Sequence, residues 1–235
     1  MKHQYFGDHR DLFMFDLVLE ILSKTGLRQL TYVPMLTRDN DSEYVLRTEA
    51  EDAIAGRDNT ILREYLHTCL TDGKLSIYET EGIFRLPGFN RFGFSLHRPR
   101  FQDQVRMQYF LSIPEEDLGN AVILLDPDEG MWSSRVGGEG EKYLRYDEIR
   151  HIYENMDPAS VLILFEHLPE KGRYESVSRV MQRLKEWVTH GRPPISISDR
   201  RETFFLLTRD NGRQGELEGL VREYETRYGL KLEDD

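Results

Sequence analysis

Two carboxylates follow an apolar run in the middle of the chain. The stretch 121–132 reads AVILLDPDEGMW, so Asp126 and Asp128 stand in the loop after a predicted buried strand. Pro127 would stiffen this turn, and Gly130 would let the backbone reverse. Paired carboxylates raise one another's proton affinity and can hold Mg²⁺ beside a phosphate. The same residue types also form good turns, so a purely structural turn is the alternative to a functional site.

A second ionisable pair ends a later apolar run. The stretch 159–167 reads ASVLILFEH and places Glu166 and His167 at the exit of another predicted strand. A histidine at a strand exit can also serve only to bond a neighbouring carbonyl. On the functional interpretation, Asp126, Asp128, Glu166 and His167 are the candidate catalytic residues.

A third group of charges surrounds the start of the first predicted helix. The stretch 5–13 reads YFGDHRDLF, in which Asp8, Arg10 and Asp11 are candidate substrate-binding residues. Asp8 is also a good helix N-cap, and acids near a helix start are favourable on dipole grounds alone. Gly7 would let the backbone approach another group closely, which a cap alone does not require.

Residues 83–106 differ in charge from the rest of the chain. The segment carries five arginines against one acid, a local charge of +4 in a chain of net charge −11, and the arginines are Arg85, Arg91, Arg98, Arg100 and Arg106. Arginines interleaved with phenylalanines can clamp phosphates while the rings stack on bases. We expect a hairpin or flap with Arg91, Arg98 and Arg100 outward, which would bind substrate, nucleic acid or another protein. The alternative is a packed hairpin whose phenylalanines enter the core.

Alternating apolar strands and amphipathic helices must position these groups. Continuous apolar runs such as NAVILLD indicate strands covered on both faces, and we therefore expect one α/β domain, residues 1–235, with a mostly parallel sheet. Right-handed crossovers would bring Asp126 and Glu166 to the same sheet edge, where ligands bind in such folds, and we expect Asp8 to join them there. The predicted helices cover about 10–22, 60–70, 147–156, 177–188 and 217–228, and the predicted strands 30–37, 105–113, 121–126, 159–167 and 202–208.

Composition narrows the classes of protein. The 235 residues are 39% hydrophobic and 31% charged, as in ordinary globular proteins, and the net charge of −11 disfavours nucleic acid and anionic membranes as partners of the whole surface. No apolar run approaches the roughly 20 residues of a membrane span, and the first residues lack a signal-peptide core, so we expect a cytoplasmic protein. Cys69 is the only cysteine, which excludes an internal disulfide and a Cys-rich zinc site. The sequence does not indicate an oligomeric state.

Several of these stretches together resemble a known pattern. YFGDHRDLFMFDL, VPMLT, LLDPDEG, KYLRYDEIR and VLILFEHLP are similar to an uncharacterised bacterial family with Tyr-Phe-Gly-Asp-x-Arg-Asp-Leu near the start and Leu-Asp-Pro-Asp-x-Gly in the middle. The resemblance touches most of the chain and brings no established activity. The chain departs from that pattern at Met14, where the family usually has lysine.

At greater distance, the second half resembles class I methyltransferase folds, and especially the three-Cys-motif partner proteins. These have an apolar strand that ends in Asp-Pro, then a helix, then a strand like VLILF. The resemblance implies a Rossmann-like, methyltransferase-like three-layer sandwich, with Asp126 and Pro127 in the substrate-facing loop and S-adenosylmethionine as a possible cofactor. The glycine-rich loop expected after 30–37 is replaced by RDNDSEY, which contains no glycine.

The stretch LLDPDEG also resembles the Asp-x-Asp-x-x-Gly signature of Toprim domains. That resemblance implies Mg²⁺ held by Asp126 and Asp128 for phosphodiester chemistry, although TYVPMLT lacks the glutamate that those domains carry after their first strand. Three functions follow as hypotheses. The first is a methyltransferase-like enzyme or its descendant without cofactor, the second a Mg²⁺-dependent phosphoesterase or nuclease, and the third a non-catalytic protein-interaction module.

Overall fold

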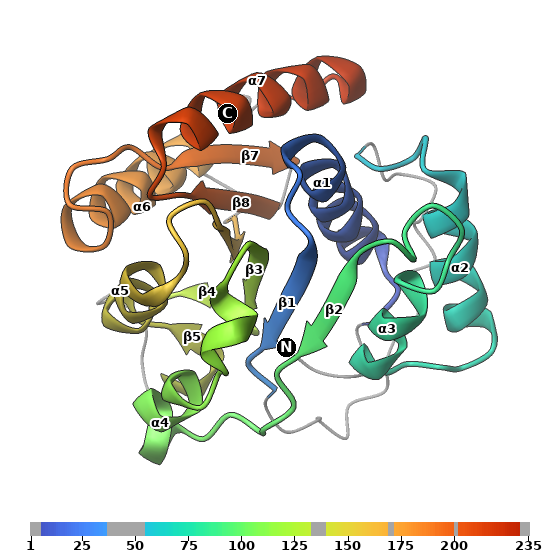
Figure 1. Ribbon diagram of the computed structural model, residues 1–235, viewed down its shortest axis with the longest axis horizontal. Helices are drawn as coiled ribbons and strands as arrows, with labels where there is room; N and C mark the ends of the chain where they lie inside the picture. Colours follow the sequence, from blue (N-terminus) through green and yellow to red (C-terminus); the bar gives the residue numbers. More distant parts are fainter. Residues whose placement is uncertain (1–5, 37–54, 133–139, 169–171, 200–201, 231–235) are drawn as a thin grey trace.

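A six-stranded sheet forms the centre of the computed structural model, which describes residues 6–36, 55–132, 140–168, 172–199 and 202–230. The strand order is β2-β1-β3-β6-β8-β7 (Figure 1). Five of the six strands run in the same direction and β8 runs opposite to them, so the expected α/β fold with a mostly parallel sheet is confirmed. The strands are β1 (Gln29–Pro34), β2 (Gly93–Leu96), β3 (Ala121–Asp126), β6 (Val161–His167), β7 (Ile195–Asp199) and β8 (Glu202–Leu207).

Helices cover both faces of the sheet and complete a three-layer sandwich of the Rossmann-like kind (Figure 1). One face packs against α1 (His9–Thr25), α2 (Thr60–Thr71), α3 (Thr80–Ile83) and α7 (Asn211–Tyr228). The other face packs against α4 (Arg106–Leu111), α5 (Tyr146–Asn155) and α6 (Arg173–Trp187). The remaining elements are the short pair β4 (Gly130–Met131) and β5 (Tyr143–Leu144), and the 3-10 turns Ile77–Glu79, Asp103–Val105, Glu115–Leu118 and Gly140–Lys142.

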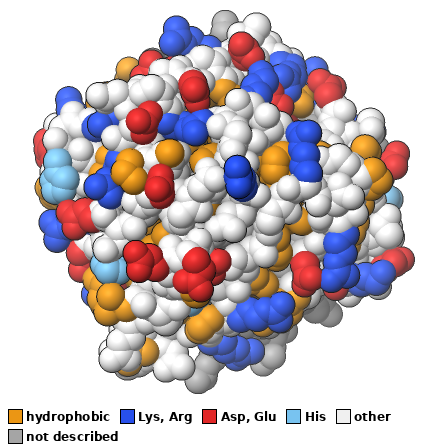
Figure 2. All heavy atoms as spheres, viewed as in Figure 1, with side chains coloured by type: hydrophobic (Ala, Val, Ile, Leu, Met, Phe, Trp, Pro, Cys, Tyr) orange, Lys and Arg blue, Asp and Glu red, His pale blue; other side chains and the backbone are white. Residues whose placement is uncertain are grey.

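The surface mixes both signs of charge. Acidic and basic side chains are interspersed on the face shown in Figure 2, with hydrophobic side chains visible between them. Within the described ranges, no helix combines the length and apolar composition that crossing a membrane requires.

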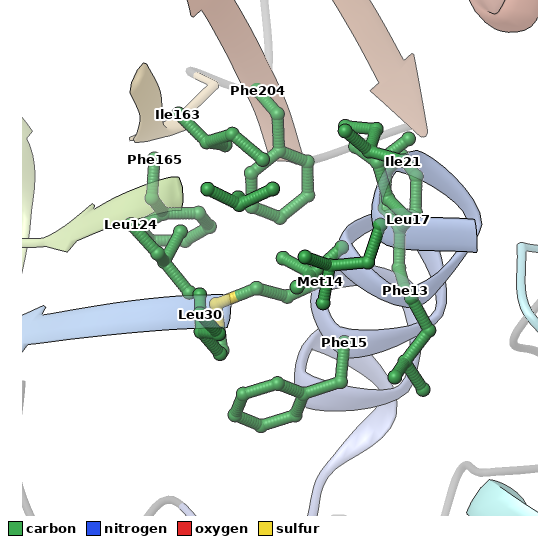
Figure 3. Close-up of a cluster of buried hydrophobic side chains, with 14 of the residues drawn as sticks. Phe13, Met14, Phe15, Leu17, Ile21, Leu30, Leu124, Ile163, Phe165 and Phe204 are labelled. Atoms are coloured by element: carbon green, nitrogen blue, oxygen red, sulfur yellow. The ribbon is translucent and has the colours of Figure 1, made fainter. Parts of the chain in front are cut away.

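Helix α1 supplies much of the core on its face of the sheet. Its sequence is apolar almost all round, and its side chains pack on β1, β3, β6 and β8 (Figure 3). Met14 is buried and lies toward Leu30 of β1 in this cluster (Figure 3). A lysine at this position, as in the family pattern, would place an ammonium group among apolar side chains, which is costly unless the charge is paired.

The predicted strand at 105–113 is wrong, because residues 106–111 form helix α4. Its buried side chains are Arg106, Tyr109 and Phe110, and Ile113 follows one turn later. This spacing is that of a helix face, and the high content of aromatic and β-branched residues obscured it. The Tyr109 hydroxyl fixes the helix by donating to the Pro34 carbonyl at 2.5 Å.

The expected hairpin or flap at 83–106 is also corrected. Residues 93–96 form β2, which lies parallel to β1 at the sheet edge with Leu30 opposite Phe94. The segment is therefore part of the central sheet. The local sequence suggested a hairpin because the partner of β2 is β1, which lies far back in the chain at residues 29–34.

Candidate functional site

The sheet has a topological switch point between β1 and β3. From β1 the chain crosses to β2 on one side, whereas β3 and β6 follow on the other side. In open α/β sheets, ligands bind beyond the carboxyl ends of the strands at such a point. The β1–β3 pairing ends with Pro34 opposite Asp126, and the Met35 amide donates to the Asp126 carbonyl at 3.0 Å. Asp126 therefore stands at the switch point itself.

The first turn of α1 meets this edge. Asp8 caps the helix by accepting from the backbone amides of Arg10 at 2.9 Å and Asp11 at 3.3 Å. The Arg10 guanidinium donates to Asp8 at 2.7 Å through Nε, and its Nη1 lies 3.4 Å from Nε2 of His167. Asp11 accepts from the Gly7 amide at 2.5 Å, and Gly7 adopts a φ of +97°. The helix start and the end of β6 are thus joined through Arg10.

Two buried carboxyl groups at this junction, those of Asp11 and Asp126, are close enough to interact electrostatically. Asp126 accepts a hydrogen bond from the Tyr32 hydroxyl at 2.6 Å. Burial raises the pKa of Asp126, although Tyr32 and Arg10 counteract it. Burial also raises the pKa of Asp11, and the negative charges of Asp8 and Asp126 act in the same direction. The pair therefore favours a proton or another positive charge.

His167 completes the group from the end of β6. Burial, together with the nearby Arg10 charge, lowers the pKa of His167 to about 4, while Asp8 and Asp128 act in the opposite direction. Its imidazole is neutral at pH 7. Asp128 is half-buried and also acts on Asp126 electrostatically. We call these residues the edge cluster: Asp8, Arg10, Asp11, Asp126, Asp128 and His167.

Glu166 reaches the same edge on the opposite face of the sheet. Successive side chains of a strand alternate between faces, so His167 lies with α1 while Glu166 lies with β4. Glu166 accepts from the Met131 amide at 2.5 Å, and Gly130, at φ +110°, packs against its carboxylate. Burial raises the pKa of Glu166 to about 8. The expected convergence thus holds for the strand ends and for the side chains of Asp8 and Asp126, whereas the Glu166 side chain points away from them.

The arginines proposed for substrate binding contact other groups. Arg91 donates to Ser23, near the end of α1, at 3.3 Å. Arg98 lies over the Tyr78 ring at 5.4 Å, and Arg100 is exposed on the loop after β2. The described structure therefore does not join Arg91 or Arg98 to the edge cluster.

Sequence reasoning missed three residues at the edge. Tyr32 bonds Asp126 directly, Tyr109 braces Pro34, and the buried Glu202 lies opposite His167 in the β6–β8 pairing. Tyr32 carried a usable signal, because a tyrosine in an otherwise apolar strand needs a partner for its hydroxyl. The sequence around Glu202 gave no such signal, because Glu202 reaches His167 only through the antiparallel register between β6 and β8.

The donor arrangement at this edge is not a ready-made metal site. Among the residues that the structure describes, no three His, Cys, Asp or Glu side chains are arranged to hold a metal ion. A scan of protein-family models gives no match to the chain, and a search of curated proteins gives none either.

Proposed function

We propose that the chain is a methyltransferase-like enzyme that binds S-adenosylmethionine at the edge cluster. The observation that carries the proposal is an excess of buried and half-buried carboxylates at the switch point of a Rossmann-like sheet. Ligands of such sheets bind at this position, and an acid-rich site favours a ligand with positive charge. Adenosylmethionine carries a sulfonium and an ammonium group, together with one carboxylate.

The residues of the edge cluster fit the charged parts of this cofactor. Asp126 and Asp128 would hold the positive groups, and Arg10 would hold the carboxylate. The bound cofactor would supply an activated methyl group. Positions 37–54, where methyltransferase folds have their glycine-rich loop, lie outside the described ranges and contain no glycine. The proposal therefore rests on the edge cluster alone.

The side chains divide into proton-carrying and positioning groups. The raised pKa values of Asp11 and Asp126 make them the groups that can take up a proton closer to neutral pH. His167 has a lowered pKa, so its neutral ring serves to position Arg10 across the cluster. Mg²⁺ held by the oxygens of Asp126 and Asp128 is the competing proposal, since such pairs suit Mg²⁺ when waters and a phosphate complete the shell.

Thermal unfolding with separate ligands tests the proposal. Adenosylmethionine at 100 times its dissociation constant should add roughly 2.7 kcal/mol to the free energy of unfolding. S-adenosylhomocysteine, which lacks the sulfonium charge, should stabilise less. Asp126→Asn should abolish the response. The matched control is Asp157→Asn, an exposed acid in the turn before β6, at the opposite sheet edge.

Each result has a distinct meaning. A response to adenosylmethionine that survives in Asp126→Asn would contradict the placement of the ligand. A response to Mg²⁺ alone that Asp126→Asn removes would replace the proposal by the phosphoester reaction. If neither adenosylmethionine nor Mg²⁺ stabilises the protein, the results favour the hypothesis of a non-catalytic protein-interaction module.

A further inference from the structure

Strand β2 is the outermost strand on one side of the central sheet. Its amides at Gly93 and His97 donate toward β1, to the carbonyls of Arg28 at 2.8 Å and Tyr32 at 2.9 Å. Because backbone groups alternate along a parallel strand, the N–H and C=O groups of Phe94 and Leu96 point away from β1. In the part of the chain that the structure describes, β1 is the sole partner of β2. Such an edge is a template for another strand.

A shallow groove of about 340 Å³ adjoins this edge. Two of its apolar residues, Phe84 and Phe94, stack with ring centroids 4.9 Å apart. Figure 2 shows hydrophobic surface over the region of β2 and α3, with acidic and basic side chains beside it. The lining residues are Glu81, Phe84, Arg85, Phe92, Phe94, Leu96 and Arg98.

The charge around the groove is opposite in sign to that of the chain. Two exposed arginines line it and two more are exposed on the neighbouring loops, against one acid in its lining, Glu81. Glu81 pairs with Arg85 at 2.5 Å and lies 4.0 Å from Arg98, which leaves an excess of positive charge. The fifth arginine of the segment, Arg106, is buried and bonded to Glu148, so it does not contribute to this surface. The exposed arginines are Arg85, Arg91, Arg98 and Arg100.

We propose that β2 and its groove bind an acidic, extended segment of a partner protein, which pairs with β2 as an additional strand. Main-chain bonds to Phe94 and Leu96 would hold the segment, its apolar side chains would enter the groove, and its carboxylates would meet the arginines. This inference is independent of the edge cluster, since it uses a different strand and different side chains.

The structure favours this occupant over nucleic acid and over a second copy. Bases need open ring faces, but Phe84 and Phe94 stack on each other and Arg98 lies over Tyr78. A second copy docked edge to edge would oppose two sets of arginines, and like charges opposite each other destabilise strand pairing. An acidic peptide satisfies both the open backbone and the charge.

Fluorescence anisotropy with a defined peptide tests the proposal. The probe is a labelled peptide of about eight residues, a common strand length, that alternates valine and glutamate. We expect a dissociation constant below ~1 mM at low salt, weakening as salt screens the arginines. A peptide in which lysine replaces glutamate should bind at least ten times more weakly. So should the same peptide with N-methylated amides on its pairing side.

Variants and hydrogen exchange locate the binding. The double variant Arg85→Glu, Arg98→Glu should weaken binding at least tenfold, whereas Arg179→Glu, an exposed arginine on α6, should not change it. Bound peptide should slow amide exchange at Phe94 and Leu96. The amides of Gly93 and His97 are already bonded to β1 and should exchange as before.

Three results would overturn the proposal. The first is no binding of the probe up to about 1 mM, or binding without protection of Phe94 and Leu96. The second is tighter binding of a single-stranded oligonucleotide that the double variant loses. The third is a concentration-dependent dimer that the double variant abolishes.

Discussion

Two arginine-centred clusters of charged side chains in this molecule differ in how completely their charges are matched. Arg106 has five N–H donors, and five bonds of 2.6 to 2.9 Å satisfy them: two to Glu148, one to Asp103, and one each to the carbonyls of Gly140 and Tyr143. Arg10 instead pairs with Asp8 and reaches His167, while Asp11 and Asp126 lie close by as further buried acids.

The difference separates a cluster whose charges are matched within the fold from a cluster with an excess of acids, which is the site where we propose that a ligand binds. The Arg106 cluster joins the start of α4 to α5 and β5, and its donors and acceptors match. The edge cluster has more negative than positive groups, and burial raises the pKa values of two of its carboxyl groups, Asp11 and Asp126. Burial raises the pKa of Glu148 as well, but the bonds from Arg106 counteract it there. Perturbed pKa values of this kind cluster at functional sites, where neighbouring like charges and burial act together.

The largest expected effect comes from breaking the matched cluster. Arg106→Ala leaves Glu148 buried without its partner, which typically costs about 3–5 kcal/mol. Urea denaturation should show this loss in the free energy of unfolding. The control Arg179→Ala should stay within about 0.5 kcal/mol of the parent. A small effect for Arg106→Ala would mean that the two clusters do not differ as described.

Glu166 is a third case, a carboxyl group outside both clusters that accepts a hydrogen bond from the Met131 amide. Its pKa is raised to about 8 from 4.5, so it contributes stability that is complete below pH 4.5 and lost as the pH rises to about 8. Glu166→Gln keeps an acceptor for the Met131 amide and cannot ionise. The variant should exceed the parent in stability above pH 8 by up to a few kcal/mol.

The substitution Glu166→Gln should not alter how the stability falls at acid pH, because His167, and not Glu166, contributes to that fall. His167 has its pKa lowered to about 4, so its contribution is complete above its ordinary value of 6.5 and is lost as the pH falls through 4. Urea midpoints of parent and Glu166→Gln measured from pH 4 to pH 9 resolve the two windows. Equal curves at alkaline pH would show that Glu166 is not held protonated by the fold. Glu115→Gln, an exposed acid, serves as the control.

The smallest expected effects are two changes in stability of opposite sign, one for each cluster. Asp126→Asn removes one of the excess charges while Tyr32 keeps its acceptor, so the ligand-free protein at pH 7 should gain roughly 1 kcal/mol. The corresponding change Glu148→Gln should lose roughly 1–3 kcal/mol, because Arg106 keeps its charge and loses its buried counter-charge, with only the more exposed Asp103 remaining. Thermal and urea unfolding of both variants give the signs. If both variants are less stable than the parent, the edge cluster has a structural role and the Asp-Pro-Asp loop is only a turn.

The sequence predicted the layers of the fold because these depend on local patterns. The apolar runs of β3 and β6 read as buried strands, and the apolar stripes of α5, α6 and α7 read as helices. The short strand Gly93–Leu96 failed as a prediction because four residues carry little pattern and β1 completes them from far away. Segment 105–113 failed because aromatic residues suit both strands and buried helix faces.

The sequence predicted the edge at which the ends of β3 and β6 meet, but it did not predict on which face of the sheet each side chain lies. Crossover handedness brings the ends of β3 and β6 together, and that rule needs no side-chain detail. The face depends on the alternation within each strand, and a continuous apolar run such as VLILF hides which side chains point to which face. Glu166 and His167 are neighbours in sequence, yet only His167 joins the edge cluster.

The early position of α1 in the chain determines when its tertiary contacts can form during synthesis. Its buried Asp16 accepts a hydrogen bond from the Tyr224 hydroxyl across 208 residues of chain, and Arg10 meets His167 across 157. This apolar helix is synthesised before the partners it contacts, and it must wait for them, since chains grow at about 5–20 residues per second. Contacts of such long range slow folding, and the exposed helix is a target for chaperones meanwhile. Arg10 reaches His167 only after β6 has been made, so a truncated chain does not assemble the edge cluster.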